Sequence, residues 1–204
     1  MHNEQIIYAG NQTTATSALV LVHGRGGSAD DILSIARHLA VPDFLLAAPQ
    51  ATGHSWYPQS FLAPVAQNEP WLTSALELLG TLVTSLEGRG IPAERIFLAG
   101  FSQGACLTLE FAARHARRYG GIAAFTGGLI GDVLQTDKYA GSFDATPVFI
   151  GTSDPDMHVP VTRVRETEAV LKTMHANVAV QVYGNMGHTI IQDELDRANT
   201  HLFG

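Results

Sequence analysis

The sequence predicts an α/β fold with one mostly parallel sheet of about seven strands and helices on both of its faces. Two observations support this prediction. Strand and helix patterns alternate along the chain, and each strand pattern is mostly apolar, as in a sheet covered on both sides. The 204 residues suffice for one large core, and no internal repeat, charge block or linker divides them. We therefore expect residues 1–204 to form a single domain.

The first half of the chain carries the first three strands. Residues 18–22 form a continuous apolar run, which is typical of a buried strand, and residues 5–9 and 44–48 are further candidates. Ser28 is suited to the N-cap of the next helix. Asp30 and Asp31 would then lie in the first turn, where negative charge is favourable. A second helix is expected over residues 70–87.

The second half continues the alternation. Residues 95–99 have the pattern of a buried strand, and the helix that follows is expected to reach Tyr119, with Gly120 as its stop. Three further strands are expected over residues 122–126, 147–150 and 178–183. Helices are expected over residues 161–175 and from residue 193.

The composition of the chain indicates which partners and which cellular location to expect. The net charge is −7 and the basic residues are scattered, which argues against a nucleic-acid partner. Cys106 is the only cysteine, so no intrachain disulfide is possible, and its apolar surroundings predict a small core residue. No secretory leader pattern or membrane-length apolar stretch is found, so we expect a cytoplasmic protein without stable membrane insertion. Both a monomer and a homodimer remain open.

The segment Gly100-Phe101-Ser102-Gln103-Gly104 lies between a predicted strand and a predicted helix. A serine with glycines two residues before and after it at such a turn is a nucleophile elbow. The glycines are needed because a side chain at either position would collide with the neighbouring strand and helix. The turn places the serine hydroxyl at a helix N-terminus, where free N–H groups favour negative charge. We therefore predict that Ser102 is a nucleophile.

Acidic residues and a histidine follow the later strands. Asp154 and Asp156 come after the strand that begins at residue 147, and His188 lies in a glycine-bordered turn after the last strand. Reactive groups gather at the carboxyl ends of parallel strands, and the order Ser, acid, His is the one used by α/β-hydrolases. His188 is thus the predicted base, whereas His54 and His158 are expected at the rim or the surface.

Residues 23–27 form a glycine-rich loop after the second strand. A phosphate cradle is a weak reading, because the loop lacks both the Lys-Ser/Thr of a P-loop and the full dinucleotide-binding spacing. A backbone N–H donated to an oxyanion suits this position better. His23 is expected to support this loop rather than to transfer protons.

Aromatic residues are concentrated between residues 50 and 69, where no helix or strand period is evident. A long loop of this kind either packs over the core or lines a ligand pocket, and both readings stay open. Trp56, Tyr57 and Phe61 are the candidate pocket residues.

The sequence resembles the phospholipase/carboxylesterase family of α/β-hydrolases, which includes acyl-protein thioesterase-like enzymes. The resemblance covers nearly the whole chain and is carried by the segments Leu21-Val22-His23-Gly24-Arg25-Gly26, Ala48-Pro49-Gln50, Trp56-Tyr57-Pro58, Gly100-Phe101-Ser102-Gln103-Gly104, Asp156-Met157-His158-Val159-Pro160 and Gly187-His188. It implies an α/β-hydrolase fold without a large cap domain.

The resemblance also implies a serine carboxylesterase that acts on small-molecule esters and needs neither metal nor organic cofactor. Ser102 would be the nucleophile, His188 the base and an aspartate near position 156 its orienting acid. The backbone N–H groups of Arg25 and Gln103 would form the oxyanion hole. Many relatives carry an apolar residue where Arg25 stands, so we expect small to medium acyl or aromatic esters rather than long lipids.

Three alternatives accompany this prediction. A thioesterase or lysophospholipase would share the machinery, and a dienelactone hydrolase-like enzyme would open cyclic esters. Enzymes of the last type carry a cysteine nucleophile, which Ser102 argues against. A non-catalytic small-ligand binding protein is disfavoured by the intact set of serine, aspartate and histidine, because mere binding needs no activated nucleophile.

Two aspartates compete for the acid. Asp154 stands three residues after Gly151, whereas Asp156 stands three before Val159, and the loop is two residues longer than in shorter relatives. We favour Asp156, because its distance from the helix that follows Val159 should fix the acid better than its distance from a strand end. Asp154, which precedes Pro155, is expected to begin a turn and cap nearby N–H groups.

Overall fold

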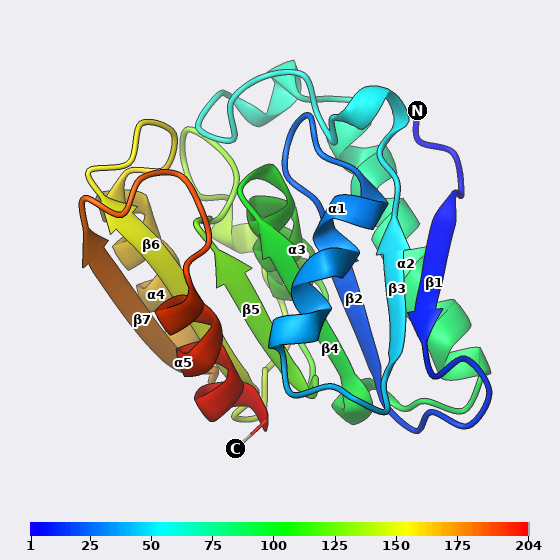
Figure 1. Cartoon of the computed structure of the whole chain (residues 1–204). Coiled ribbons are helices and arrows are strands. Elements are labelled where there is room, and N and C mark those ends of the chain that lie inside the picture. The colour runs from blue at the N-terminus through cyan, green and yellow to red at the C-terminus, as the bar shows by residue number, and fades with distance from the viewer. Residues whose placement is uncertain (204) are drawn as a thin grey trace.

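The computed structural model of the protein describes residues 1–203, which form a seven-stranded sheet in the order β1-β3-β2-β4-β5-β6-β7. Strand β1 pairs with β3 in the antiparallel sense, and all other pairs are parallel. Figure 1 shows α1 and α5 in front of this sheet and the other helices behind it. The predicted mostly parallel α/β fold is confirmed.

The bounds of the elements agree with most of the predicted ranges. The strands are β1 Ile6–Gly10, β2 Ala18–Val22, β3 Leu45–Pro49, β4 Ile96–Phe101, β5 Gly121–Phe125, β6 Pro147–Asp154 and β7 Asn177–Gly184. The α-helices are α1 Ala29–Leu33, α2 Trp71–Gly88, α3 Gln103–Arg114, α4 Val161–Thr173 and α5 Gln192–Phe203. Among residues 1–203, no helix is long and apolar enough to cross a membrane.

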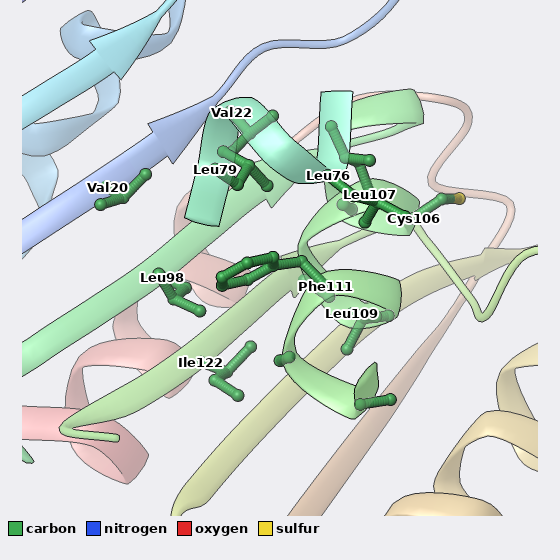
Figure 2. Close-up of a cluster of buried hydrophobic side chains, with 14 of the residues drawn as sticks. Val20, Val22, Leu76, Leu79, Leu98, Cys106, Leu107, Leu109, Phe111 and Ile122 are labelled. Carbon is green, nitrogen blue, oxygen red and sulfur yellow. The ribbon is translucent and has the colours of Figure 1, made fainter. Parts of the chain in front are cut away.

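The sheet separates two layers of core, because successive side chains of a strand point to opposite faces. On β2, Val20 and Val22 face the layer under α2, α3 and α4, whereas Leu19 and Leu21 face the layer under α1 and α5. Figure 2 shows part of the first layer, in which Phe111 of α3 lies among side chains of α2 and the central strands. Both faces of the central strands are therefore apolar, as the continuous run at residues 18–22 predicted.

The start of α1 follows the predicted cap. The Ser28 hydroxyl accepts a hydrogen bond from the Asp31 backbone N–H, and the Asp31 carboxylate accepts one from the Ser28 backbone N–H. This reciprocal arrangement is a capping box, which satisfies two N–H groups that the helix itself leaves free.

Helix α3 is shorter than predicted, because it ends at Arg114 rather than near Tyr119. The Tyr119 backbone N–H donates to the Thr146 hydroxyl at 2.9 Å, and the Gly120 N–H donates to the Ile96 carbonyl at 3.0 Å. These long-range partners draw residues 115–120 to the sheet, so they leave the helix before Gly120 could act as its stop.

Strand β6 is longer than predicted. Residues 151–154, which were expected to be a loop, pair with β7 as far as Asp154 opposite Gly184. The backbone groups of this segment are therefore satisfied by the neighbouring strand, and the loop that bears Asp156 begins only after Asp154.

Candidate active site

Ser102 lies in the turn between β4 and α3 with φ 54° and ψ −119°, a backbone conformation that residues other than glycine seldom adopt. Its backbone N–H donates to the Phe125 carbonyl at 2.9 Å. A Cβ atom at Gly100 would lie 2.5 Å from the Gly104 carbonyl carbon, and one at Gly104 would overlap the Val22 carbonyl oxygen. The two glycines thus allow β4, α3 and β2 to approach closely enough to hold the turn.

The side chains of Ser102, His188 and Asp156 form one hydrogen-bonded row. His188 Nε2 lies 2.8 Å from Ser102 Oγ, and His188 Nδ1 lies 2.9 Å from Asp156 Oδ2. Both loops that carry the acid and the histidine leave the carboxyl ends of neighbouring strands, β6 and β7. Residues that are 86 and 32 positions apart therefore meet at the upper edge of the sheet in Figure 1.

The Asp156 side chain is fully shielded from solvent, while 21% of the His188 side chain is exposed. Asp156 Oδ1 accepts hydrogen bonds from the backbone N–H groups of His158 and Val159, each at 2.8 Å. Burial alone would raise the pKa of Asp156, but these bonds and the one from His188 outweigh burial and hold the pKa below its ordinary value. The carboxylate is thus charged at neutral pH and faces the histidine.

Asp154 is placed differently. It is the last residue of β6, it is exposed, and its carbonyl accepts a hydrogen bond from the Asn185 N–H across the sheet. The prediction that its side chain would cap nearby N–H groups is wrong, because Asp156 makes those contacts. The pairing of β6 with β7 carries the chain past Asp154 before the turn begins.

Two backbone N–H groups, those of Arg25 and Gln103, were predicted to form the oxyanion hole. Gln103 is the first residue of α3, so its N–H is one of those that the helix leaves free, and Arg25 follows β2 in the glycine-rich loop. Within residues 1–203, neither N–H donates a hydrogen bond. The N-terminus of α3 favours negative charge near the Gln103 N–H, which suits this group to an oxyanion.

His23 lies beneath the glycine-rich loop. Its Nδ1 is 2.7 Å from the Gly24 carbonyl, and its Nε2 is 3.1 Å from the Ala51 backbone nitrogen. Nδ1 therefore donates and Nε2 accepts, as in a neutral imidazole, and burial lowers the pKa of His23. The ring holds residues 24 and 51 together, in line with the supporting role that was predicted.

A cavity of about 570 Å³ opens beside Ser102. It is lined by Arg25, Tyr57, Pro58, Gln59, Ser60, Phe61, Leu62, Ser102, Gln103, Cys106, Met157, His158 and Pro160. Of the three predicted pocket residues, Tyr57 and Phe61 line it. Trp56 does not: it is fully buried below, where its indole N–H donates to the His23 carbonyl at 2.8 Å. The aromatic loop therefore both packs on the core and lines the cavity.

Three further residues of the cavity, Met157, His158 and Cys106, were not predicted as pocket residues. Met157 is 84% exposed at its rim, and the His158 ring lies edge-on to His188 with 4.8 Å between ring centroids. His158 was expected at the rim, but nothing in the sequence indicated its contact with His188. Cys106 is buried in the wall, and burial raises the pKa of its thiol to about 12. It is therefore an inert thiol at neutral pH.

Arg25 is exposed, but its guanidinium is bound to the protein. Its guanidinium binds residues 55–59 at the cavity edge, and the buried Gln103 side chain binds the same segment. Sequence reasoning gave the Gln103 side chain no role and connected the Arg25 side chain only with the size of the acyl group. Two features of the sequence could have indicated these side-chain contacts. Gln103 is a polar residue directly after Ser102, and Arg25 is an arginine within a glycine-rich loop.

A model of the phospholipase/carboxylesterase family matches residues 2–203. A phospholipase/carboxylesterase from Dyadobacter fermentans DSM 18053, which has a crystal structure, is 52% identical in sequence to this chain. It superposes with a TM-score of 0.98 and covers 100% of this chain and 98% of its own.

Curated proteins show the same similarity at greater distance. A probable carboxylesterase of Oryza sativa subsp. japonica is 26% identical, over 88% of this chain and 74% of that protein. Acyl-protein thioesterase 1 of Eremothecium gossypii is also 26% identical, over 90% of this chain and 86% of its own length. The chain thus belongs to the phospholipase/carboxylesterase family and is a hydrolase of carboxylic ester bonds.

Proposed function

We propose that this protein hydrolyses esters of small to medium acyl groups, aromatic ones included, through an acyl-enzyme formed on Ser102. The observation that carries the proposal is the position of His188, which lies 2.8 Å from the serine oxygen and 2.9 Å from the Asp156 carboxylate. A base between a hydroxyl nucleophile and an orienting acid is the arrangement that activates serine.

In the proposed mechanism, His188 Nε2 takes the proton of Ser102 while the serine oxygen attacks the acyl carbon. The Asp156 carboxylate accepts a hydrogen bond from the Nδ1–H group, which keeps Nε2 free as the proton acceptor, and its charge stabilises the imidazolium that forms. His188 then protonates the departing alkoxide. Water repeats the two steps on the acyl-enzyme, which releases the carboxylic acid and restores Ser102.

The charge that develops on the substrate oxygen needs donors in place before the reaction. We assign this role to the backbone N–H groups of Arg25 and Gln103, which have no other acceptor among residues 1–203. Such preorganised donors stabilise the tetrahedral intermediate, and losing one typically lowers kcat by about 10² to 10³.

The size of the acyl group follows from the cavity. Its volume of about 570 Å³ suits a small molecule, and a polar edge formed by Arg25, Gln59 and Ser60 interrupts the apolar surface of Phe61 and Leu62. A long acyl chain would have to lie across these hydrated groups, which disfavours it.

Thioesters are the second candidate substrate class. The similarity to an acyl-protein thioesterase favours them, and the same row of serine, histidine and aspartate would serve a thiolate leaving group. Parallel assays of matched oxygen and sulfur esters of one acyl group separate the two classes.

The first test is Ser102→Ala. Ester turnover should fall by several powers of ten with the fold intact, because the hydroxyl is small and its role is chemical. A fluorophosphonate probe should label the wild type stoichiometrically and leave Ser102→Ala unlabelled. Ser85→Ala, an exposed serine of α2, is the matched control. More than about a tenth of wild-type activity in pure Ser102→Ala would refute the assignment.

The second test measures kcat/KM for p-nitrophenyl esters from acetate to palmitate. We expect the maximum at short or medium chains and a decline toward palmitate. A steady rise through the palmitoyl ester would contradict the proposed size preference while leaving the serine mechanism in place.

A further inference from the structure

We propose that residues 55–59, which we call the brace, hold the oxyanion hole in shape, and that the Arg25 and Gln103 side chains are positioning residues that act through it. This inference rests on the proposed function, because it takes the backbone N–H groups of these two residues as the oxyanion donors. It assigns their side chains a separate task.

The Gln103 side chain is fixed at both ends of its amide. Its Nε2 donates to the Tyr57 carbonyl at 2.8 Å, and its Oε1 accepts from the Trp56 backbone N–H at 2.9 Å. Only 7% of the residue is exposed, so water does not compete for these bonds. The brace thereby holds the first residue of α3, next to Ser102, by its side chain.

The Arg25 guanidinium holds the brace from the other side. Its Nη1 donates to the Ser55 hydroxyl at 3.0 Å and the Pro58 carbonyl at 3.1 Å. Its Nη2 donates to the Tyr57 carbonyl at 2.8 Å and the Gln59 carbonyl at 2.7 Å. Both terminal nitrogens are thus fully used in one planar fork, a geometry that the single ammonium of lysine cannot reproduce.

The two side chains meet at one atom, the Tyr57 carbonyl oxygen. Arg25 and Gln103 belong to different elements, so this shared acceptor links the loop after β2 to the N-terminus of α3. The brace is itself anchored, because Trp56 and Tyr57 are buried and the Trp56 indole binds the His23 carbonyl. A donor pair from separate elements needs such a link, since catalytic groups must be held within about 0.5 Å of their productive positions.

The variants Arg25→Lys and Gln103→Met remove the bonds to the brace while keeping the backbone N–H groups and the approximate side-chain size. Each should lower kcat for p-nitrophenyl butyrate by about 10- to 100-fold, less than the loss of a whole donor, and change KM by less than about threefold. Arg25 is exposed, so Arg25→Lys should fold even if Gln103→Met does not.

Arg163→Lys is the matched control. The Arg163 guanidinium also holds a loop by its carbonyls, at Leu129 and Asp132 with 3.0 and 3.2 Å, but this loop carries neither oxyanion donor. We expect Arg163→Lys to lower the Tm and to leave kcat within about twofold, because its loss is structural.

Two further measurements separate positioning from stability. A trifluoromethyl ketone forms an oxyanion on the enzyme, so its inhibition constant should rise in parallel with the loss of kcat/KM, whereas that of the product butyrate should not change. The pH profile of kcat/KM should keep its apparent pKa values, because the row of Ser102, His188 and Asp156 is untouched. The double variant should lose less than the product of the single losses, since both act through one carbonyl.

Wild-type kcat and ketone inhibition in Arg25→Lys, with only the Tm lowered, would overturn the inference, and so would strictly multiplicative losses in the double variant. Failure of the proposed function is recognised separately. In that case the wild type would not be labelled by fluorophosphonate, or Ser102→Ala would remain active.

Discussion

Two carboxyl side chains are buried beside β6, yet at neutral pH one is a charged carboxylate and the other is protonated. Asp156 has a fully shielded side chain and a lowered pKa, whereas Glu194 of α5 is also fully buried and its pKa is raised to about 8. Asp156 accepts from two backbone N–H groups and from His188. Within residues 1–203, neither Glu194 oxygen meets a hydrogen-bond donor in good geometry.

The difference shows that hydrogen-bond donors act together with depth in deciding the charge of a buried carboxyl, since Glu194 is both deeper and poorer in donors. Burial penalises the charged form at both sites. At Asp156 the chain turns back so that its own N–H groups face the carboxylate and compensate for lost hydration. Glu194 packs over Gly151, where, among the described residues 1–203, the Ile191 N–H alone opposes the effect of burial, and it does so in part. The charged carboxylate lies where the proposed chemistry uses it.

Asp156→Asn should have the largest effect, a loss of kcat. The uncharged amide can donate a hydrogen bond to Nδ1, which a carboxylate cannot, so His188 should take the wrong tautomer and kcat should fall by up to about 10⁴. Steady-state kinetics on a variant shown to be folded by circular dichroism measures the loss.

Asp154→Asn is the control for that experiment. Asp154 is exposed at the end of β6 and its side chain makes no hydrogen bond to residues 1–203, so kcat should stay within about twofold. An inactive Asp154→Asn beside an active Asp156→Asn would transfer the acid role to Asp154.

Glu194→Gln tests whether the buried Glu194 carboxyl makes the stability of the protein depend on pH. The carboxyl has an ordinary pKa of 4.5 and a raised pKa of about 8 in the fold, so between these values the native state holds a proton that the unfolded chain has lost. The free energy of unfolding should therefore fall as pH rises through this window, by up to about 1.4 kcal/mol per pH unit. Glutamine does not titrate, so the variant should lose this slope.

Urea unfolding of the wild type and Glu194→Gln at pH 5, 6, 7 and 8 measures the effect. As pH rises, the free energy of unfolding of Glu194→Gln should increase relative to that of the wild type. A difference that stays constant from pH 5 to pH 8 would show that Glu194 does not titrate in this range.

The smallest effect concerns Gly151. A Cβ atom there would overlap the Glu194 carboxyl group, so Gly151→Ala should destabilise the protein by about 1 to 3 kcal/mol. Glu194→Ala makes room for the methyl group, and the cost of Gly151→Ala should shrink in that background. Equal costs in both backgrounds, measured by a double-mutant cycle, would show that the two residues do not share this space.

Local patterns accounted for most of the fold. The continuous apolar runs predicted the central strands, and Ser28 with the acidic first turn predicted the start of α1. The ends of elements were less well predicted, because they depend on distant partners. Helix α3 stops at Arg114 since Tyr119 binds Thr146, just before β6, and Gly120 binds Ile96 of β4. Strand β6 runs to Asp154 since β7 continues beside it.

By itself, the sequence determined the turn that holds Ser102 and the family, because the glycine spacing and the motif order are local and steric. Its proposals for His188 and Asp156 stay predictions, although the structure brings both side chains to Ser102. Only the tertiary structure decided that Trp56 lies in the core, that Arg25 and Gln103 converge on the Tyr57 carbonyl, and that Glu194 is buried without a strong donor. These features arise where segments far apart in the chain meet, and their energies depend on distances and burial that no local pattern encodes.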